Sequence, residues 1–230
     1  MKKVVLFWSA GKDSAMALHN ILNDKSFELV ALVTTLNQDY KRISMHGIPE
    51  QILDLQCEAV GLPVIKMWVP NLPDNNSYEY CFLELCKDLK EKGVEFLAFG
   101  DIHLEDLRKY REDLVNQGGL KACFPLWNVP TLKLMNNFIA NEFKAITCCI
   151  NTKILSADWL GRQLDADFVA ELPNEVDLCG ENGEYHTFCF AGPIFMNSIP
   201  YQTGERVFKP LKINSKEGES ESGFLFLDII

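Results

Sequence analysis

The sequence predicts an α/β fold: an open parallel sheet with helices on both faces, followed by a smaller α+β domain. Short apolar runs alternate with longer segments of helical spacing through the first hundred residues, a pattern typical of strand–helix–strand crossovers. The runs are continuously apolar, as in strands buried on both faces of a parallel sheet. A stretch punctuated by proline and glycine, 118–130, leads into a second region. We therefore expect two domains, residues 1–120 and residues 121–230.

The chain opens with a strand, a turn and a helix. The run VVLFW at 4–8 is the first strand, and after a four-residue turn residues 14–22 place Ala15, Leu18 and Ile21 on one helical face. The remaining elements are expected as strands at 28–35, 63–69, 96–100, 143–150, 185–190 and 224–229, helices at 49–60, 77–92, 103–116, 132–141, 157–164 and 165–172, and a polar loop at 216–223.

The bulk composition is that of an ordinary globular enzyme. With 47% hydrophobic and 23% charged residues among 230, the chain can bury a core by itself, which argues against disorder, collagen-like repeats and coiled coils. No run approaches the roughly 18 to 20 apolar residues that cross a bilayer, and the apolar run near the N-terminus is too short for a secretory signal. We expect a cytoplasmic protein without a membrane partner.

Charge and cysteine usage narrow the classes of partner. The formal net charge of −10 opposes the phosphate-neutralising attraction that dominates nonspecific nucleic-acid binding, so free nucleic acid is a disfavoured partner. The eight cysteines include no CxxC pair, which argues against zinc and thioredoxin-like sites and fits a reducing compartment.

The segment SAGKDS, Ser9 to Ser14, lies between the first strand and the first helix. Backbone N–H groups and the positive end of the helix dipole converge there, so the segment predicts an anion site. Gly11 permits close approach of the backbone, Lys12 supplies a cation, and the two serine hydroxyls can donate to phosphate oxygens. The Walker A and GxGxxG spacings are absent. The alternative is a plain helix cap, with Asp13 or Ser14 at the N-cap.

A second cluster, CGENGEYHT at 179–187, packs two carboxylates, an imidazole and a hydroxyl around two glycines. If 185–190 is a strand, Glu184 and His186 point to the same side. A carboxylate beside an imidazole suits proton transfer. The alternative is a glycine-rich turn with a solvated strand edge. Elsewhere His46, in a predicted loop, is either a ligand contact or incidental.

Several motifs together resemble one enzyme family. FWSAGKDSAMAL is similar to the SGGxDS pyrophosphate loop of the N-type ATP pyrophosphatases, with Ala10 in place of the first glycine. SMHGIP, FGDI, FPLW, LGRQLD and CGENGEYHTF follow in the order seen in the diphthine–ammonia ligase family of these enzymes. The resemblance runs from residue 3 to about residue 196. It implies a HUP-type ATP-binding domain over 1–120 and a substrate-binding domain over 121–230.

The resemblance implies a ligase that adenylates a carboxylate or amide oxygen of an acceptor, releases pyrophosphate and then amidates with ammonia. In the resembling enzymes the acceptor is diphthine on elongation factor two, and Mg²⁺ is expected because the leaving pyrophosphate is highly charged. The candidate catalytic residues are Lys12, Glu184 and His186. The candidate nucleotide-binding residues are Ser9, Ala10, Gly11, Lys12, Asp13, Ser14, Thr34 and Asp101. The candidate acceptor-binding residues are Glu181, Glu184, His186 and Thr187, and the candidate metal ligands are Asp101 and Glu181.

Three alternatives remain open at this point. His186 stands where the resembling ligases look to have glutamate, which leaves room for a small carboxylate or amide acceptor, for instance in cobalamin-related metabolism. An RNA-modifying sulfur or amino transferase would share the pyrophosphate loop, but the net charge of −10 argues against it. A nonenzymatic adenine-nucleotide sensor would not need the cluster at 181–187. Assembly into a homo-oligomer is a further expectation.

Overall fold

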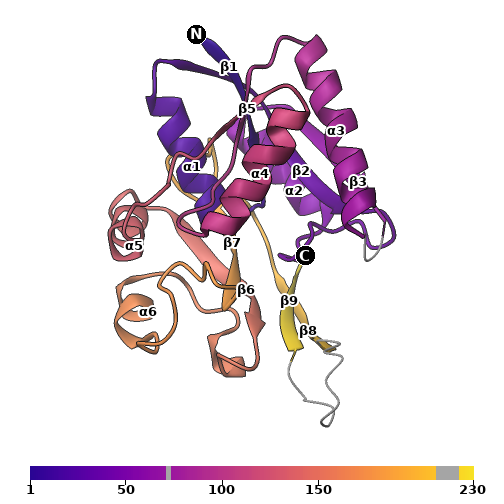
Figure 1. Cartoon of the computed structure of the whole chain (residues 1–230). Helices are drawn as coiled ribbons and strands as arrows, with labels where there is room; N and C mark the ends of the chain where they lie inside the picture. The colour runs from indigo at the N-terminus through magenta and orange to yellow at the C-terminus, as the bar shows by residue number, and fades with distance from the viewer. Residues whose placement is uncertain (71–73, 211–222) are drawn as a thin grey trace.

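The first half of the chain forms a five-stranded parallel sheet (Figure 1). The computed structural model describes residues 1–70, 74–210 and 223–230, so the polar loop expected at 216–223 lies outside the described residues except for its last position. The strand order is β3-β2-β1-β4-β5, and every neighbouring pair is parallel. The strands are β1 Lys2–Phe7, β2 Phe27–Asn37, β3 Val64–Val69, β4 Phe96–Ala98 and β5 Lys121–Cys123.

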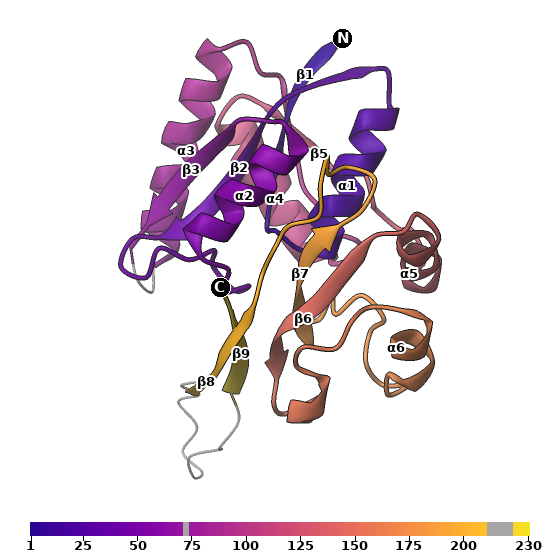
Figure 2. The ribbon, with the colours of Figure 1, turned by 180° about the vertical axis from the view of Figure 1, so that it is seen from behind.

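Helices cover both faces of this sheet, as the alternating pattern predicts. Two separate groups of buried apolar side chains fill the space between the sheet and its helices, one under α1 and α2 and the other under α3 and α4. Figures 1 and 2 show these two pairs of helices on opposite sides. The helices are α1 Lys12–Asn23, α2 Glu50–Val60, α3 Asn75–Glu91 and α4 Glu105–Gln117.

The second half is built on a four-stranded antiparallel sheet of order β7-β6-β9-β8. Two short helices lie beside β6 and β7, on the far side from β8 and β9 (Figures 1 and 2). The elements are α5 Thr131–Ala140, β6 Lys144–Asn151, a 3-10 turn at Ala157–Trp159, α6 Ala166–Glu171, β7 Tyr185–Ala191, β8 Thr203–Pro210 and β9 Gly223–Ile229.

Buried side chains from both halves form one continuous core. Leu6 of β1 and Leu18 of α1 belong to the same cluster as Phe138 and Phe188 of the second half. β5 completes the parallel sheet from residues just beyond position 120. The division into domains 1–120 and 121–230 therefore stays a prediction. None of the helices in the described parts of the chain is long and apolar enough to span a bilayer.

The helix predicted at 157–164 is wrong. Only one 3-10 turn forms, at Ala157–Trp159, because the next residues turn back along β6. The Thr147 hydroxyl accepts the backbone N–H groups of Gly161 and Arg162, and Gly161 is in the left-handed region at φ 86°. These bonds to another strand replace the i to i−4 bonds that a helix requires.

Candidate functional site

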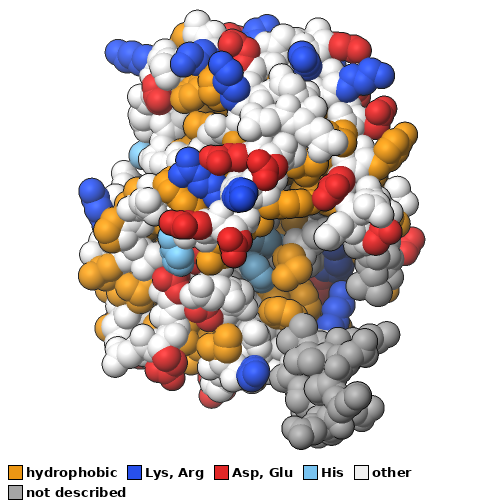
Figure 3. Space-filling model, in the orientation of Figure 1, with side chains coloured by type: hydrophobic (Ala, Val, Ile, Leu, Met, Phe, Trp, Pro, Cys, Tyr) orange, Lys and Arg blue, Asp and Glu red, His pale blue; other side chains and the backbone are white. Residues whose placement is uncertain are grey.

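A cavity of about 590 Å³ lies at the carboxyl ends of the parallel strands, a volume that suits a small-molecule ligand. The sheet order reverses between β1 and β4, which is the point where open α/β sheets bind ligands. The lining comes from the carboxyl ends of the first four strands, the start of α1, the β2–α2 connection, α3, α4, the loop before β7 and the first residues of β7. Figure 3 shows a hollow on the face toward the viewer, with histidine, acidic and hydrophobic side chains around it.

The segment Ser9 to Ser14 forms one wall of this cavity. Ser9, Lys12, Asp13 and Ser14 all line it, whereas Ala10 and Gly11 do not. The Ser9 hydroxyl donates to the Ser14 hydroxyl at 3.2 Å, and the Ser14 hydroxyl donates to the Gly11 carbonyl at 2.9 Å. The loop is therefore folded with its polar side chains toward the cavity.

Ala10 takes a left-handed conformation with φ 68°, which costs an L-residue about 1 kcal/mol. Glycine adopts this conformation freely, which accounts for the glycine of the similar pyrophosphate loops. The neighbouring chain holds Ala10 in place, because its carbonyl accepts the Cys189 N–H at 2.9 Å and the Gln56 side-chain amide at 3.2 Å.

Strand β7 closes the back of the loop. The Thr187 hydroxyl accepts the backbone N–H of Lys12 at 3.0 Å. The N-cap position of α1 is Gly11, which has no side chain to cap the helix, so Thr187 acts as the cap from another strand. The alternative with Asp13 or Ser14 as the N-cap is therefore wrong. A Cβ atom on Gly11 would lie 2.6 Å from Cε1 of His46 and 3.0 Å from the Thr187 carbonyl oxygen, so a side chain here would force its neighbours to shift.

Lys12 is buried and points toward the loop that precedes β7. Its Nζ donates to both Asp13 carboxylate oxygens at 2.9 Å and to the Cys179 carbonyl, and it lies 5.4 Å from the centre of the Tyr185 ring. Burial opposes the ammonium charge and is the largest single effect, but the adjacent Asp13 carboxylate together with Tyr185 and Cys179 outweighs it and raises the pKa of Lys12 above its ordinary value. Lys12 is therefore a permanent cation.

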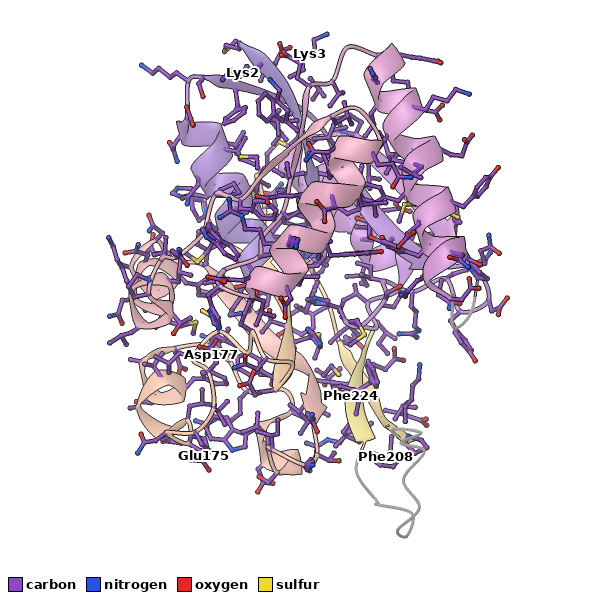
Figure 4. All side chains as sticks on the ribbon, viewed as in Figure 1. Lys2, Lys3, Glu175, Asp177, Phe208 and Phe224 are labelled. Carbon is purple, nitrogen blue, oxygen red and sulfur yellow. The ribbon has the colours of Figure 1, made fainter. Side chains whose placement is uncertain are left out.

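Glu184 lies outside the cavity lining and holds the preceding loop together. Its carboxylate accepts the backbone N–H of Asp177 at 3.0 Å and the backbone N–H of Asn182 at 2.9 Å. Asp177 in turn accepts the N–H of Cys179 at 2.9 Å and that of Glu181 at 3.2 Å. Figure 4 labels Asp177 in this loop, in the connection from α6 to β7.

Replacing Glu184 by glutamine is expected to destabilise the fold by about 1–3 kcal/mol, because an amide nitrogen would then face a backbone N–H that has lost its acceptor. Urea unfolding and steady-state turnover of Glu184→Gln measure the two effects separately. A variant with unchanged stability and a large loss of kcat would instead place Glu184 at the reacting atoms.

Two further carboxylates, besides that of Asp13, line the cavity. The Glu181 Oε1 accepts the N–H of Ile102 at 2.8 Å, and burial raises its pKa to about 7 although this hydrogen bond opposes the shift. Asp101 pairs with Arg111, with 2.5 Å between Oδ2 and Nε. Burial raises the pKa of Asp101 despite that pairing. Across the described ranges, no three His, Cys, Asp or Glu side chains are placed to hold a metal ion by themselves.

Two histidines complete the site. His46, from the β2–α2 connection, and His186, on β7, both line the cavity, and their ring centres are 4.8 Å apart. Burial lowers the pKa of His46. Burial, with smaller effects from His46 and Lys12, lowers the pKa of His186 to about 3. Both rings are therefore neutral in the free protein at neutral pH.

Acidification from about pH 7.5 to about pH 5.5 is expected to cost the fold about 1.4 kcal/mol through His186 alone. Because its folded pKa of about 3 is below the unfolded value, the stabilising contribution is complete above about pH 6.5. Below that pH the unfolded chain binds a proton that the folded chain does not, so the contribution shrinks as the pH falls. Urea unfolding of the protein and of His186→Asn at both pH values isolates this difference, and equal losses in the two proteins would contradict it.

The structure brings most of the predicted site residues together, with exceptions. Thr34 is fully buried, and its hydroxyl donates to the Trp8 carbonyl at 2.8 Å, so Thr35 lines the cavity in its place. Thr187, Glu181 and Asp101 all line it. Sequence reasoning missed Tyr78 and Arg111, which line the cavity, and Gln56, whose side-chain amide holds the loop at the Ala10 carbonyl, because none of them belongs to a recognisable local motif.

The fold and the site together define a HUP-type α/β protein with a phosphate loop of the ATP-binding PP-loop class. A family model described as the diphthamide synthase N-terminal domain matches residues 1–122, and one described as the diphthamide synthase C-terminal domain matches residues 130–215. The chain therefore belongs to the diphthamide synthase family.

Named relatives agree with this membership. The diphthine–ammonia ligase of Rattus norvegicus is 28% identical over 233 residues, which cover 89% of this chain and 85% of the relative. That of Danio rerio is 26% identical over 245 residues, with 97% and 93% covered. That of Homo sapiens is 29% identical over 184 residues, with 73% and 67% covered.

Proposed function

We propose that this protein is an ATP-dependent ligase that adenylates an acceptor oxygen, releases pyrophosphate and then amidates the acceptor with ammonia. The observation that carries the proposal is the loop Ser9 to Ser14, which opens at the start of α1 into a cavity at the switch point of the sheet. Family membership supports the use of ATP by a ligase.

The phosphate chain of ATP is expected to lie along this loop. The hydroxyls of Ser9 and Ser14 reach the cavity, and the positive end of the α1 dipole points at the same place. Lys12 would leave its contacts with Asp13 and the Cys179 carbonyl to meet the leaving pyrophosphate. Thr35, at the end of β2, is the expected neighbour of the adenosine.

Mg²⁺ fits this site as an ion held mainly by the phosphates. Such ions usually take only one or two protein carboxylates, and Asp101 and Glu181 are the candidates because both face the cavity. When bound, the ion would neutralise charge that develops on the leaving pyrophosphate.

The reaction would proceed in two displacements. An acceptor oxygen forms a bond to the α-phosphorus of ATP while the bond to the bridging oxygen breaks, and pyrophosphate leaves along the loop. The nitrogen of ammonia then bonds to the activated acceptor carbon, AMP leaves with the acceptor oxygen, and one proton of the ammonia is released to solvent. The chain contributes chiefly positioning and fixed charge, with Lys12 beside the phosphates and His186 and Glu181 on the acceptor side.

There are two candidate acceptors for this reaction. The names of the relatives point to diphthine, a modified protein side chain. His186 favours the second candidate, a small carboxylate or amide, because the resembling ligases look to have glutamate at this position. A sulfur transferase is disfavoured, because burial raises the pKa of the cavity thiol Cys179 to about 12 and keeps it protonated. We expect a cytosolic location, where the eight free cysteines would stay reduced.

The test is to incubate the protein with ATP, Mg²⁺ and ammonium, with and without a diphthine-bearing protein, and to identify the phosphate products. We expect AMP and pyrophosphate in equal amounts and only with an acceptor. A small-metabolite acceptor would give the same products when that metabolite replaces the protein. Release of ADP and inorganic phosphate, or no product with any acceptor, would overturn the proposal. Tight ATP binding without product from any acceptor would favour a nucleotide sensor.

A further inference from the structure

His46 lies directly against the phosphate loop, although nothing in the proposed reaction uses it. A Cβ atom placed on Gly11 would lie 2.6 Å from Cε1 of His46, so the ring edge touches the loop backbone. His186 stands beside it at 4.8 Å between ring centres, and both rings line the cavity that Ser9 and Lys12 line. The His46 ring therefore lies where the phosphates are expected, and His186, on the acceptor side, stands beside it.

The hydrogen bonding of His46 fixes its tautomer. Its Nδ1 lies 2.9 Å from the backbone carbonyl oxygen of Thr187. A carbonyl oxygen can only accept, so Nδ1 must carry the hydrogen. In the neutral ring Nε2 is then a bare acceptor and repels a phosphate oxygen. His46 can donate to phosphate from Nε2 only after taking up a proton. The Nε2 atom of His186 is buried and has no hydrogen-bond partner within the described residues.

The side chains that line the cavity carry too little positive charge to balance a nucleoside triphosphate. Its charged lining residues, within the described part of the chain, are two cations, Lys12 and Arg111, and three carboxylates, Asp13, Asp101 and Glu181. Each of the cations is already paired with a carboxylate. A proton on a histidine beside the loop would supply charge that the other side chains do not.

We propose that the Nε2 atom of His46 donates a hydrogen bond to the phosphate chain of bound ATP, and that the His46–His186 pair takes up a proton from solvent when ATP binds. The inference rests on the proposed binding of ATP at this loop. Nδ1 keeps its hydrogen bond to Thr187, the proton from solvent becomes the Nε2 hydrogen, and no covalent bond of the nucleotide changes. The bound polyphosphate stabilises the imidazolium that burial and Lys12 disfavour in the free protein.

The charged groups around the His46–His186 pair determine the pKa values of the two rings. Lys12 lowers the pKa of both rings, Asp13 raises that of His46, and His46 lowers that of His186. Because these charges partly cancel, a bound triphosphate becomes the dominant local charge. Nucleotide affinity should then rise as the pH falls, and it should do so more steeply than the titration of the nucleotide's own terminal phosphate predicts.

The test is calorimetric titration of the whole protein with Mg²⁺ and α,β-methylene ATP, which cannot be cleaved at the α-phosphorus. Measurements near pH 7.5 in two buffers of different ionisation enthalpy give the protons taken up per nucleotide. We expect clear uptake by the protein and none, beyond the nucleotide's own titration, in His46→Asn. The asparagine amide keeps a donor near the position of Nδ1 for Thr187 but has no group at Nε2, and we expect about tenfold weaker binding. His19→Gln, outside the cavity lining, is the matched control and should behave as the parent.

The outcomes separate this inference from the proposed function. Nucleotide binding without proton uptake, or full uptake retained in His46→Asn, overturns the inference and leaves the ligase proposal standing. No nucleotide binding by the parent protein overturns both. A second measurement needs no variant: histidine ¹H–¹⁵N spectra should show a neutral ring with hydrogen on Nδ1 in the free protein and an additional protonated ring with nucleotide. A free His46 with its hydrogen on Nε2 would overturn the inference.

Discussion

Replacing Lys12 by methionine is expected to slow ATP cleavage by about a hundredfold or more, the loss seen when a group that stabilises transition-state charge is removed. Lys12 is the one cation that the phosphate loop itself carries, and its pairing with Asp13 keeps it charged in a buried site. Pyrophosphate release under saturating ATP and acceptor measures the effect, which should fall mainly on kcat because the charge develops as the bond breaks.

A structural role for Lys12 has to be separated from this chemical one. The single variant also leaves the Asp13 carboxylate without its partner, so a loss of stability is expected as well. The double variant Lys12→Met with Asp13→Asn removes both charges and should recover stability without recovering turnover. Lys25→Met, at an exposed position, is the charge-matched control. Recovery of turnover in the double variant would contradict a catalytic role for Lys12.

The parts of the fold that sequence patterns predicted are those with strong local signals. The buried strands β1 and β2 are apolar runs, and the helices between strands have one apolar face. β5 was missed because it has only three residues in a segment rich in turn signals. β8 was missed because it is an edge strand whose residues are mostly exposed, so it needs no apolar alternation. Its register is set by pairing with β9, which lies beyond a stretch of intervening chain.

The site residues that could be predicted are likewise those with a strong local sequence signal. The loop Ser9 to Ser14 is contiguous, so its chemistry can be read from a short string. Glu184 was placed beside His186 by extending the alternation of a strand, but β7 begins only at Tyr185. Gly183 takes a left-handed conformation, and the Glu184 side chain turns back into the loop. Its actual contacts depend on the loop conformation, which no period in the sequence encodes.

Gln56 shows why the remaining residues could not be predicted. It is a polar residue on a helix whose other inward positions, such as Leu53 and Cys57, are apolar, and by pattern alone it belongs on the surface. It is instead completely buried. Its side chain accepts from the Trp8 indole at 3.1 Å and donates to the carbonyls of Ala10 and Cys189 at 3.2 and 2.6 Å. These partners come from two segments that are both far from Gln56 in the sequence, residues 8–10 and strand β7.

Replacing Gln56 by alanine should therefore cost about 4 kcal/mol, because it leaves buried polar groups unpaired and opens a cavity. Denaturant unfolding measures the loss. Gln56→Met fills the space but leaves the same groups unpaired, so it should recover only the cavity part of the cost. Gln51→Ala, exposed on the same helix, should stay within about 0.5 kcal/mol of the parent.

The same substitution has a functional consequence. Because the Gln56 amide joins the phosphate loop at Ala10 to strand β7 at Cys189, its loss frees the loop from the strand that carries the cap Thr187. Nucleotide affinity should fall in both Gln56→Ala and Gln56→Met, although methionine preserves the packing. A methionine variant that binds ATP like the parent would show that the loop keeps its conformation without this link and that Gln56 serves stability alone.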